Sequence, residues 1–551
     1  MSFTKGGAAG SLAAAMLVFA ALLLSGCKQG PNFFSPAAPE EMGYTAPGEA
    51  VPPVDQPGLK TNAAQRIAVG AKVQNEWWKL FRSPQLDRAI RDAFADSPTI
   101  AQANATLLQA REQTIAVAGG LLPQVDLNSE IGRQAVNVRI SGVNRPAIPV
   151  NLYGVGPSAS YALDVFGSIK RQIEAQAAQA DVSDYQLAAA YLALSGNITS
   201  QAITIAGVNA QIKTVNTIIA DDQRNLTLIK TAQTGGTATM VDVTTAQTQL
   251  ANDRALLPPL RQQLSVARDA LTVFVGKTPA DWSPPDFELK GLALPPVVPV
   301  SLPSEFVRQR PDILAAEAQL YVSAAQLGVA TANLYPKFNI TAAFAQTVTD
   351  FSHPTGGFAG WNVLAQMAAP IFHGGTLTAQ QRAAKHALDA SWAAYRGTVI
   401  SAFGQVADQL QALAHDDEAV KAQQAAVSVA GEALRLARLS YEAGNSTLFQ
   451  LLDSQRQRDQ AQIGLVRAQT QQLADTSLLL VAMGSGWWNT PPSAPGPEPD
   501  PHALVPGSPT SQPKLPATKE PDDGPFWLRW FGESPGPNAP KADAPKADAE
   551  K

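Results

Sequence analysis

Two long stretches of the chain place an apolar residue at every seventh position, which is the spacing of a coiled-coil seam. The two series superpose at an offset of 208 residues. The first consists of Tyr191, Ile198, Ile205, Ile212, Ile219 and Leu226, and the second of Val399, Val406, Leu413, Val420, Val427, Leu434 and Tyr441. Each stretch is therefore predicted to be a long helix packed against partner helices. A single helix over 168–233 would be roughly 100 Å long, at about 1.5 Å per residue.

A different pattern precedes each long helix, in which apolar residues alternate with small or polar ones. It occurs in 124–131 and 152–165, and again in 338–344 and 361–371. This alternation is typical of membrane-spanning strands with one face toward lipid and one toward a lumen, although half-buried soluble strands also alternate. Pro157 is an anomaly in this pattern, because proline cannot donate a ladder hydrogen bond.

The two patterns belong to one unit that occurs twice in the chain. Segment 100–127 aligns with 313–340, and Gly236 aligns with Gly444. Each half is predicted to contain a helix, a strand pair, a very long helix, a tight turn and another long helix. The chain is predicted to begin with a signal peptide over 1–26 and a lipid-anchored N-terminal linker and equatorial segment over 27–96. The first repeat covers 97–276, with a β-hairpin at about 124–166 and a helical hairpin at about 167–276, and a Pro-rich equatorial linker follows over 277–305. The second repeat covers 306–484, with a β-hairpin at about 337–372 and a helical hairpin at about 373–484, and a disordered Pro/Ala-rich tail is predicted over 485–551.

Four strands per chain cannot form a membrane barrel alone, because the smallest such barrels have about eight. An open sheet edge in lipid would leave backbone groups without hydrogen bonds, at several kcal/mol each. The strands must therefore be shared between subunits, and sequence physics leaves two or three subunits open. Helices of roughly 100 Å exceed a bilayer core of about 30 Å, so they must project out of the membrane.

The N-terminus has the pattern of a lipoprotein signal. Lys5 precedes an apolar stretch over 13–24, which ends in Leu24-Ser25-Gly26-Cys27. Cys27 is the only cysteine in the 551 residues, and it stands where a thiol would be lipidated. An ordinary signal peptide with a chance cysteine is the alternative. The Pro-rich stretch 31–57 is predicted to be a tether and not part of the fold.

Composition excludes several classes of protein. With a net charge of −5, a basic nucleic-acid-binding surface is not expected. After residue 26 we find no uninterrupted apolar run of the about 20 residues that a spanning helix needs, so a membrane crossing would use strands. The five histidines show no HExxH spacing, and the sequence contains neither a C-x-x-C nor a G-x-S-x-G motif. We therefore expect neither an enzyme nor a cofactor other than a covalent lipid on Cys27.

An ordered set of motifs resembles the outer-membrane efflux protein family, which is TolC-like, in the lipoprotein branch that serves multidrug pumps. The matching stretches are Leu24-Ser25-Gly26-Cys27, Gln29-Gly30-Pro31-Asn32-Phe33, Trp77-Trp78-Lys79-Leu80-Phe81, Leu257-Pro258-Pro259-Leu260-Arg261 and Arg310-Pro311-Asp312-Ile313. The resemblance implies an α plus transmembrane-β fold, in which a homotrimer forms one 12-stranded β-barrel and a long coiled α-helical barrel. It also implies an exit duct in the outer membrane of a tripartite efflux pump. The implied partners are a periplasmic adaptor protein and an inner-membrane RND transporter.

The resemblance assigns the periplasmic end to the two turns between long helices. Gly236, Thr237, Gly444 and Asn445 would contact the adaptor. Asp242, Asp453 and Tyr441 would form the gate, where threefold symmetry assembles rings of carboxylates. Asp242 has an alternative role as an acid in the first turn of a helix, and Tyr441 as a seam residue. The chain has Gln450 and Ser446 where the family often has a second carboxylate and an arginine, which implies a thinner gate network.

Two other functions fit parts of the sequence. The same fold could serve a type I secretion system, although the lipoprotein signal favours a drug-pump duct. A poreless periplasmic coiled-coil lipoprotein would explain the heptads but not the lipid-facing strands. The aromatic patch from Phe526 to Phe531 in the tail could dock on a partner, on the chain's own helices or at a membrane interface, or have no role.

Overall fold

The computed structural model describes residues 28–38, 43–46, 48–55, 63–136, 139–140, 143–144, 148–348 and 358–484. The chain divides into two compact units, 1–493 and 494–551, and all the described residues belong to the first. Cys27 and the patch from Phe526 to Phe531 lie outside the described residues, so the predictions made for them stay predictions.

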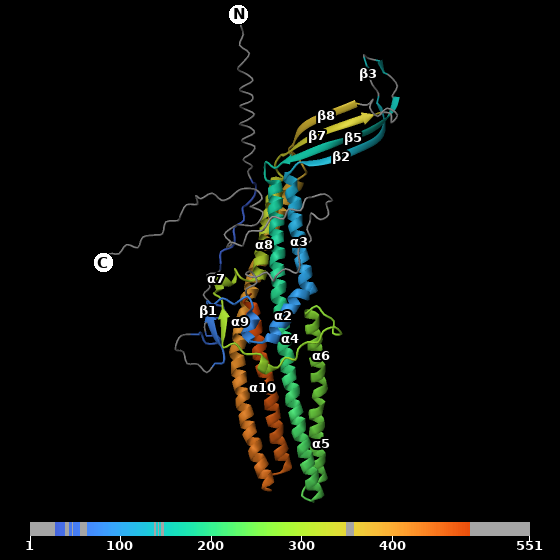
Figure 1. Cartoon of the computed structure of the whole chain (residues 1–551). Coiled ribbons are helices and arrows are strands. Elements are labelled where there is room, and N and C mark those ends of the chain that lie inside the picture. The colour runs from blue at the N-terminus through green and yellow to red at the C-terminus, as the bar shows by residue number, and fades with distance from the viewer. Residues whose placement is uncertain are drawn as a thin grey trace, which may run out of the picture. The chain divides into compact units, whose positions relative to one another are not determined.

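A four-stranded antiparallel sheet combines the strands of both repeats (Figure 1). Its order is β2 (Gln124–Val136), β5 (Ile148–Leu163), β7 (Lys337–Val348) and β8 (Phe358–Ala368). The central β5–β7 ladder, which pairs Tyr153 with Val348 and Leu163 with Phe338, joins the first repeat to the second. A short ribbon of β3 (Arg139–Ile140) and β4 (Val143–Asn144) lies between β2 and β5 in the sequence.

Pro157 is accommodated in β5 without a change of register. The ladder to β2 runs through Gly156 and Pro157, whereas the ladder to β7 is interrupted at these two residues and resumes with the same register. The two strands approach closely at the interruption. A β-carbon on Gly156 would stand 1.8 Å from the carbonyl oxygen of Phe344, so only glycine fits there.

Two helices of 67 residues continue from the sheet: α4 (Ser168–Thr234) follows β5, and α9 (Thr376–Glu442) follows β8 (Figure 1). The prediction of one continuous helix over 168–233 is confirmed. The heptad seams are also confirmed, because Ile198 and Ile205 of α4 and Val406 and Leu413 of α9 are buried in one hydrophobic cluster. The shorter helices α3 (Pro98–Ala118) and α8 (Pro311–Ala332) precede the strands and pack on α4, and α8 also packs on α9.

The helix that follows the first turn is broken, where one long helix was expected. α5 (Met240–Ala255) ends before Leu256, and α6 (Leu257–Phe274) begins after it. Pro258 and Pro259 lack amide hydrogens and their rings clash with carbonyls one turn earlier, so a regular helix cannot pass through them. The corresponding helix of the second repeat, α10 (Leu448–Ala482), contains no proline and is continuous.

Within the described residues, α8 is the one helix long and apolar enough to span a membrane, with 22 residues and an 18-residue window whose mean hydropathy is 1.2. Asp312 and Glu317 interrupt its apolar residues, so α8 is not an uninterrupted apolar run of the kind described above. Its side chains Ile313 and Leu320 are buried, and it packs between α4 and α9. We therefore interpret α8 as a core helix of the bundle.

The segments outside the repeats form a small folded layer and not merely linkers. β1 (Arg66–Val69) pairs in parallel with β6 (Val297–Val300), which lies within the expected linker 277–305. The other elements of this layer are η1 (Trp77–Phe81), α2 (Pro84–Asp96), η3 (Leu289–Gly291) and α7 (Pro303–Phe306), and the short η2 (Gly119–Leu121) closes α3. Trp77, Phe81, Phe287 and Phe306 are all fully buried, so this layer contributes the largest side chains of the core.

The prediction of a tether over 31–57 is wrong for its described residues. Phe33 stacks on Tyr321 of α8, with 4.7 Å between the ring centroids. The Tyr44 hydroxyl donates a 2.8 Å hydrogen bond to the Ser301 carbonyl, and its ring packs edge-on against Phe306. Proline restricts this segment to extended backbone, and that stiffness lowers the entropic cost of docking its aromatic side chains.

Candidate functional site

The turn between α4 and α5 reverses the chain in five residues. Gly236 has a φ of 78°, which is the left-handed conformation that glycine adopts without strain. The Thr237 amide donates a 2.9 Å hydrogen bond to the Ala232 carbonyl, which satisfies the end of α4. The turn thus has a defined geometry that presents Gly236 and Thr237 at the helix ends.

Thr239 caps the helix that leaves this turn, and Asp242 completes the cap. Asp242 Oδ2 accepts hydrogen bonds from the Thr239 amide at 2.7 Å and from the Thr239 hydroxyl at 2.8 Å, and Thr239 Oγ1 accepts from the Asp242 amide. This reciprocal arrangement is a capping box. The hydrogen bonds from the Thr239 amide and then its hydroxyl lower the pKa of Asp242. In the single chain, Asp242 therefore has the alternative role given above, that of an acid in the first turn of a helix.

The second turn, between α9 and α10, repeats the same geometry. Gly444 has a φ of 75°, and the Asn445 amide donates a 2.8 Å hydrogen bond to the Ser440 carbonyl. Thr447 caps α10, and Gln450 completes the capping box. Gln450 lies 208 residues after Asp242, so the neutral residue that replaces a carboxylate here takes over the same capping role.

Asp453 and Tyr441 stand in different surroundings. The Asp453 carboxylate accepts hydrogen bonds from Arg456 and from Gln457, the latter at 2.7 Å, so its partners lie on its own helix. Tyr441 is half-buried against a small apolar cluster that ties the two turns together. The buried members of that cluster are Ile229, Val243, Ala246, Leu434, Leu448 and Leu451. The carboxylates of Asp242 and Asp453 thus belong to separate helices, and each is satisfied locally.

Sequence reasoning missed a group of buried carboxylates where α4, α5 and α10 meet. Asp222 on α4 is 4% exposed, and its Oδ1 accepts a 2.9 Å hydrogen bond from Gln455 on α10. Burial, together with a hydrogen bond and repulsion from Asp253 on α5, raises the pKa of Asp222 to about 8. Burial also raises the pKa of Asp459 on α10 to about 6, although Arg458 opposes the rise.

A signal for this cluster is present in the heptads. Asp222 lies seven residues after Val215 and seven before Ile229, so it places a charge in a seam whose other positions from 187 to 229 are apolar except for Gln201. Polar residues at seam positions are a common device for setting helix register. In the described part of the chain, no group of three or more His, Cys, Asp or Glu side chains is placed to hold a metal ion.

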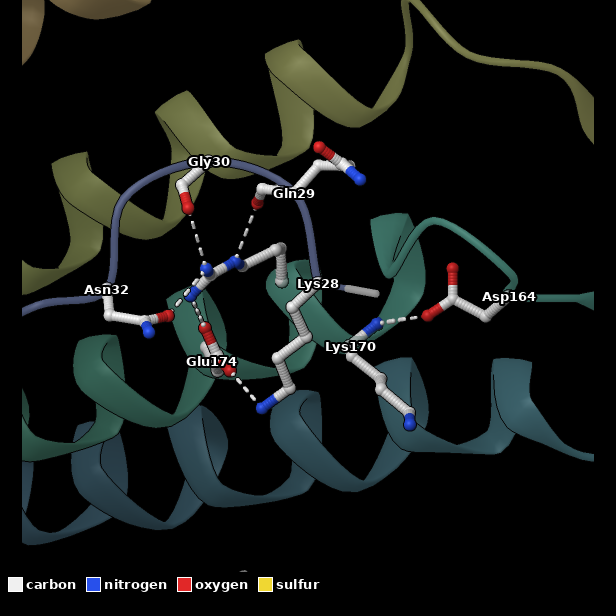
Figure 2. Close-up of polar contacts among 8 residues, drawn as sticks. Lys28, Gln29, Gly30, Asn32, Asp164, Lys170 and Glu174 are labelled. Carbon is white, nitrogen blue, oxygen red and sulfur yellow. Dashed lines mark hydrogen bonds and ion pairs between the residues drawn. The ribbon is translucent and has the colours of Figure 1, made fainter. Parts of the chain in front are cut away.

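A second polar site lies at the opposite end of α4, next to the sheet (Figure 2). Arg171, which is 2% exposed, donates hydrogen bonds to Glu174, to the carbonyls of Gln29 and Gly30, and to the side chain of Asn32. At the entrance to α4, the amides of Ile169 and Lys170 donate to Asp164. No periodicity in the sequence indicates this site.

The family of the chain is established by comparison with known proteins. Residues 89–277 and 302–485 match the model of the outer membrane efflux protein family, so the chain belongs to that family. The two matched ranges correspond to the two repeats. This is a family of outer-membrane channel and transport proteins and not a family of enzymes.

Named relatives and solved structures agree with this assignment. The chain is 27% identical to the pyoverdine export outer membrane protein OpmQ of Pseudomonas aeruginosa, over 86% of this chain and 96% of OpmQ. It is 28% identical to the outer membrane protein OprJ of the same organism, over 85% of this chain and 94% of OprJ. The outer-membrane channel OprN has the same fold, with a TM-score of 0.74 and 23% identity, over 84% of this chain and all of OprN. The chain is thus an outer-membrane channel of the efflux type, and the predicted fold and location are confirmed.

Proposed function

We propose that three copies of this chain form the exit duct of a tripartite efflux pump, which passively conducts substrates from a periplasmic adaptor and an inner-membrane RND transporter to the exterior. The observation that carries the proposal is an open four-stranded sheet continuous with two 67-residue helices. In the described part of the chain β2 pairs only with β5 and β8 only with β7, so both outer edges are available to other subunits. Three copies would supply the twelve strands that the resemblance implies.

The exposed side chains of the edge strands support a lipid-facing barrel. Val125, Leu127 and Ile131 alternate along β2 and are more than 70% exposed. Trp361, Val363 and Met367 on β8 alternate in the same way and are more than 60% exposed. Exposed rows of apolar side chains such as these are unfavourable in water and favourable in lipid. A poreless coiled-coil lipoprotein would not need it.

The helix turns carry apolar side chains that a docking partner could cover. Met240 and Val241 follow the first turn and Phe449 follows the second, and all three are at least 66% exposed. We assign the adaptor contacts to Gly236, Thr237, Gly444 and Asn445, next to these side chains. The relative TtgC of Pseudomonas putida, which is 27% identical, is named a probable efflux pump outer membrane protein, and this favours a pump component over a type I secretion channel.

The gate is assigned to Asp242, Asp453 and Tyr441, in line with the resemblance. In a trimer, each carboxylate position would occur three times around the axis, and such a ring favours cations. The hydrogen bonds from Thr239 keep the Asp242 carboxylate ionised in the isolated chain. A lipid on Cys27 completes the proposal and would anchor the N-terminus in the same membrane.

Single-channel conductance in planar bilayers tests this function. The wild-type trimer is expected to give small, cation-selective currents, and the double variant Asp242→Ala/Asp453→Ala to give currents several-fold larger. Asp389→Ala, which removes a carboxylate that is 64% exposed near the other end of α9, is the matched control and is expected to behave as wild type. Unchanged currents in the double variant would move the gate away from these carboxylates. A trimer without any conductance would overturn the channel function.

A further inference from the structure

The motif Gln29-Gly30-Pro31-Asn32-Phe33 has no part in conduction or gating, yet it occupies a built site on α4 and α8. Arg171 makes four hydrogen bonds there, and three of its acceptors belong to this motif. They are the Gln29 carbonyl at 3.0 Å, the Gly30 carbonyl at 3.2 Å and the Asn32 side-chain oxygen at 2.9 Å. A buried guanidinium is costly unless its donors are paired, so the site is fully satisfied only when the segment is bound.

The side chain of Lys28 brings a second cation to the site (Figure 2). Glu174 is 4% exposed and pairs with Arg171 at 2.7 Å through one oxygen and with Lys28 at 2.7 Å through the other. The Glu174 carboxylate thus binds one cation from α4 and one from the N-terminal segment. Lys28 is the residue directly after Cys27.

The backbone of the segment lies in close contact with α8. Gly30 has a φ of 88°, and a β-carbon on it would stand 2.6 Å from the Gly328 Cα of α8. A β-carbon on Gly328 would in turn stand 2.8 Å from the Arg171 side chain. Two glycines therefore let the segment, α8 and α4 lie in direct contact at this point.

Contacts further along the segment continue the docking on α8 and on the residues just before it. Phe33 stacks on Tyr321, and Ser35 donates a hydrogen bond to Glu317. Arg308 donates a 2.7 Å hydrogen bond to the Pro36 carbonyl. Residues 28–36 thus follow the bundle as one strap, which we call the N-terminal strap.

The strap begins at the junction between the sheet and the helices. The Gln29 amide donates a 3.3 Å hydrogen bond to the Phe166 carbonyl, in the connection between β5 and α4. A β-carbon on Gly167, which caps α4, would stand 3.1 Å from the Lys28 Cα. Residue 28 is therefore held where the strand passes into the helix.

We propose that Arg171 and Glu174 are the binding seat for the N-terminal strap, and that this seat holds Lys28, the residue bonded to the lipidated cysteine, at the β5–α4 junction. The proposal rests on the lipidation of Cys27 proposed above. It makes the lipid attachment a short, rigid connection beside the chain's own strands. A flexible tether of some 27 residues would instead separate the anchor from the folded chain by a root-mean-square distance of about 30 Å.

Trypsin tests the seat, because Lys28 is followed by no lysine or arginine until Lys60. Cleavage after Lys28 leaves a chain that begins at Gln29, and mass spectrometry of the full-length protein in detergent measures its rate. Proteolysis of a docked segment follows the fraction of time it is undocked. In Arg171→Ala, which removes charge-assisted hydrogen bonds, we expect cleavage after Lys28 to be at least about tenfold faster than in wild type.

Two further variants make the test decisive. Asn32→Ala alters only the strap and leaves the helices intact, so it is expected to accelerate cleavage several-fold even if Arg171→Ala does not fold. Lys170→Ala is the matched control, because Lys170 is exposed next to Arg171 and its backbone amide bonds to Asp164. This control is expected to protect Lys28 as well as wild type does.

Equal cleavage in wild type and in Asn32→Ala would overturn the seat. The same spectra report the lipid separately, because cleavage removes a lipidated Cys-Lys dipeptide if Cys27 is modified. A protected Lys28 without lipid on Cys27 would keep the seat and refute its role as an anchor point. Neither the cleavage rate nor the lipid mass depends on conductance. Failure of the proposed channel function can therefore be told apart from failure of the seat.

Discussion

The side chain of Gln455 on α10 donates a 2.9 Å hydrogen bond to the buried carboxylate of Asp222 on α4. This contact crosses from the second repeat to the first, about three helical turns from the end of α4 and about two from the start of α10. Asp222 belongs to a group of carboxylates that comes from the three helices α4, α5 and α10. We therefore expect the joint between the two helical hairpins to depend on the protonation of these carboxylates.

The first prediction concerns the pH dependence of stability. The pKa of Asp222 is about 8 in the folded chain, against 3.8 for an unperturbed side chain, so between these values the folded state binds a proton that the unfolded state lacks. Its contribution to stability is present at low pH and is lost as the pH rises toward 8. We expect the temperature of heat-induced trimer dissociation to fall between pH 5 and pH 8. Asp222→Asn should flatten this slope, whereas the exposed Asp389→Asn should keep it; an unchanged slope in Asp222→Asn would contradict the assignment.

The second prediction concerns the first helix turn. Gly236→Ala places a side chain at a φ of 78° and should destabilise the turn by about 1 kcal/mol. Gly235→Ala is the matched control, because the adjacent Gly235 has a φ of −81° that alanine adopts freely. Amide hydrogen exchange of residues 232–240 measures the difference. Equal exchange in the two variants would show that the left-handed conformation is not required.

The third prediction concerns the sheet. Gly156→Ala would force its β-carbon against the Phe344 carbonyl and separate β5 from β7, so we expect loss of heat-resistant trimer from the outer-membrane fraction. Gly360→Ala on β8 meets nothing within 4 Å and should assemble normally. Normal trimer yield from Gly156→Ala would mean that the two strands can separate without opening the barrel.

The fourth prediction concerns the acid sensitivity of the gate. The Thr239 amide and hydroxyl lower the pKa of Asp242, and a carboxyl with a lowered pKa stays charged to lower pH. Thr239→Val removes the hydroxyl donor, so the loss of cation selectivity on acidification should begin at higher pH than in wild type. Reversal potentials under a salt gradient from pH 7 to pH 3 measure this. Identical titrations would remove Asp242 from the selectivity-determining group.

Local patterns in the sequence were sufficient for the long helices, the strands and the positions of the two helix turns, whereas the gate and adaptor roles of residues near these turns stay predictions. The heptads predicted α4 and α9, and the alternation predicted strands in both repeats. The turns at Gly236 and Gly444 could be placed because each required a glycine between two periodic segments. The break at Leu256 was also readable in principle, because Pro258 and Pro259 forbid a continuous helix.

Contacts between distant segments were decided only by the tertiary structure. The pairing of β5 with β7, the burial of Asp222 beside Gln455 and the seat of Arg171 for the strap each join residues far apart in the chain. A seam position indicates that Asp222 is unusual but does not say which helix covers it. Residues 31–57 are rich in proline and polar residues, which describes a tether and a docked strap equally well. The sequence by itself determined periodicity, turns and repeats, because these depend on neighbours along the chain, whereas the partners of polar groups depend on which surfaces the folded bundle brings together.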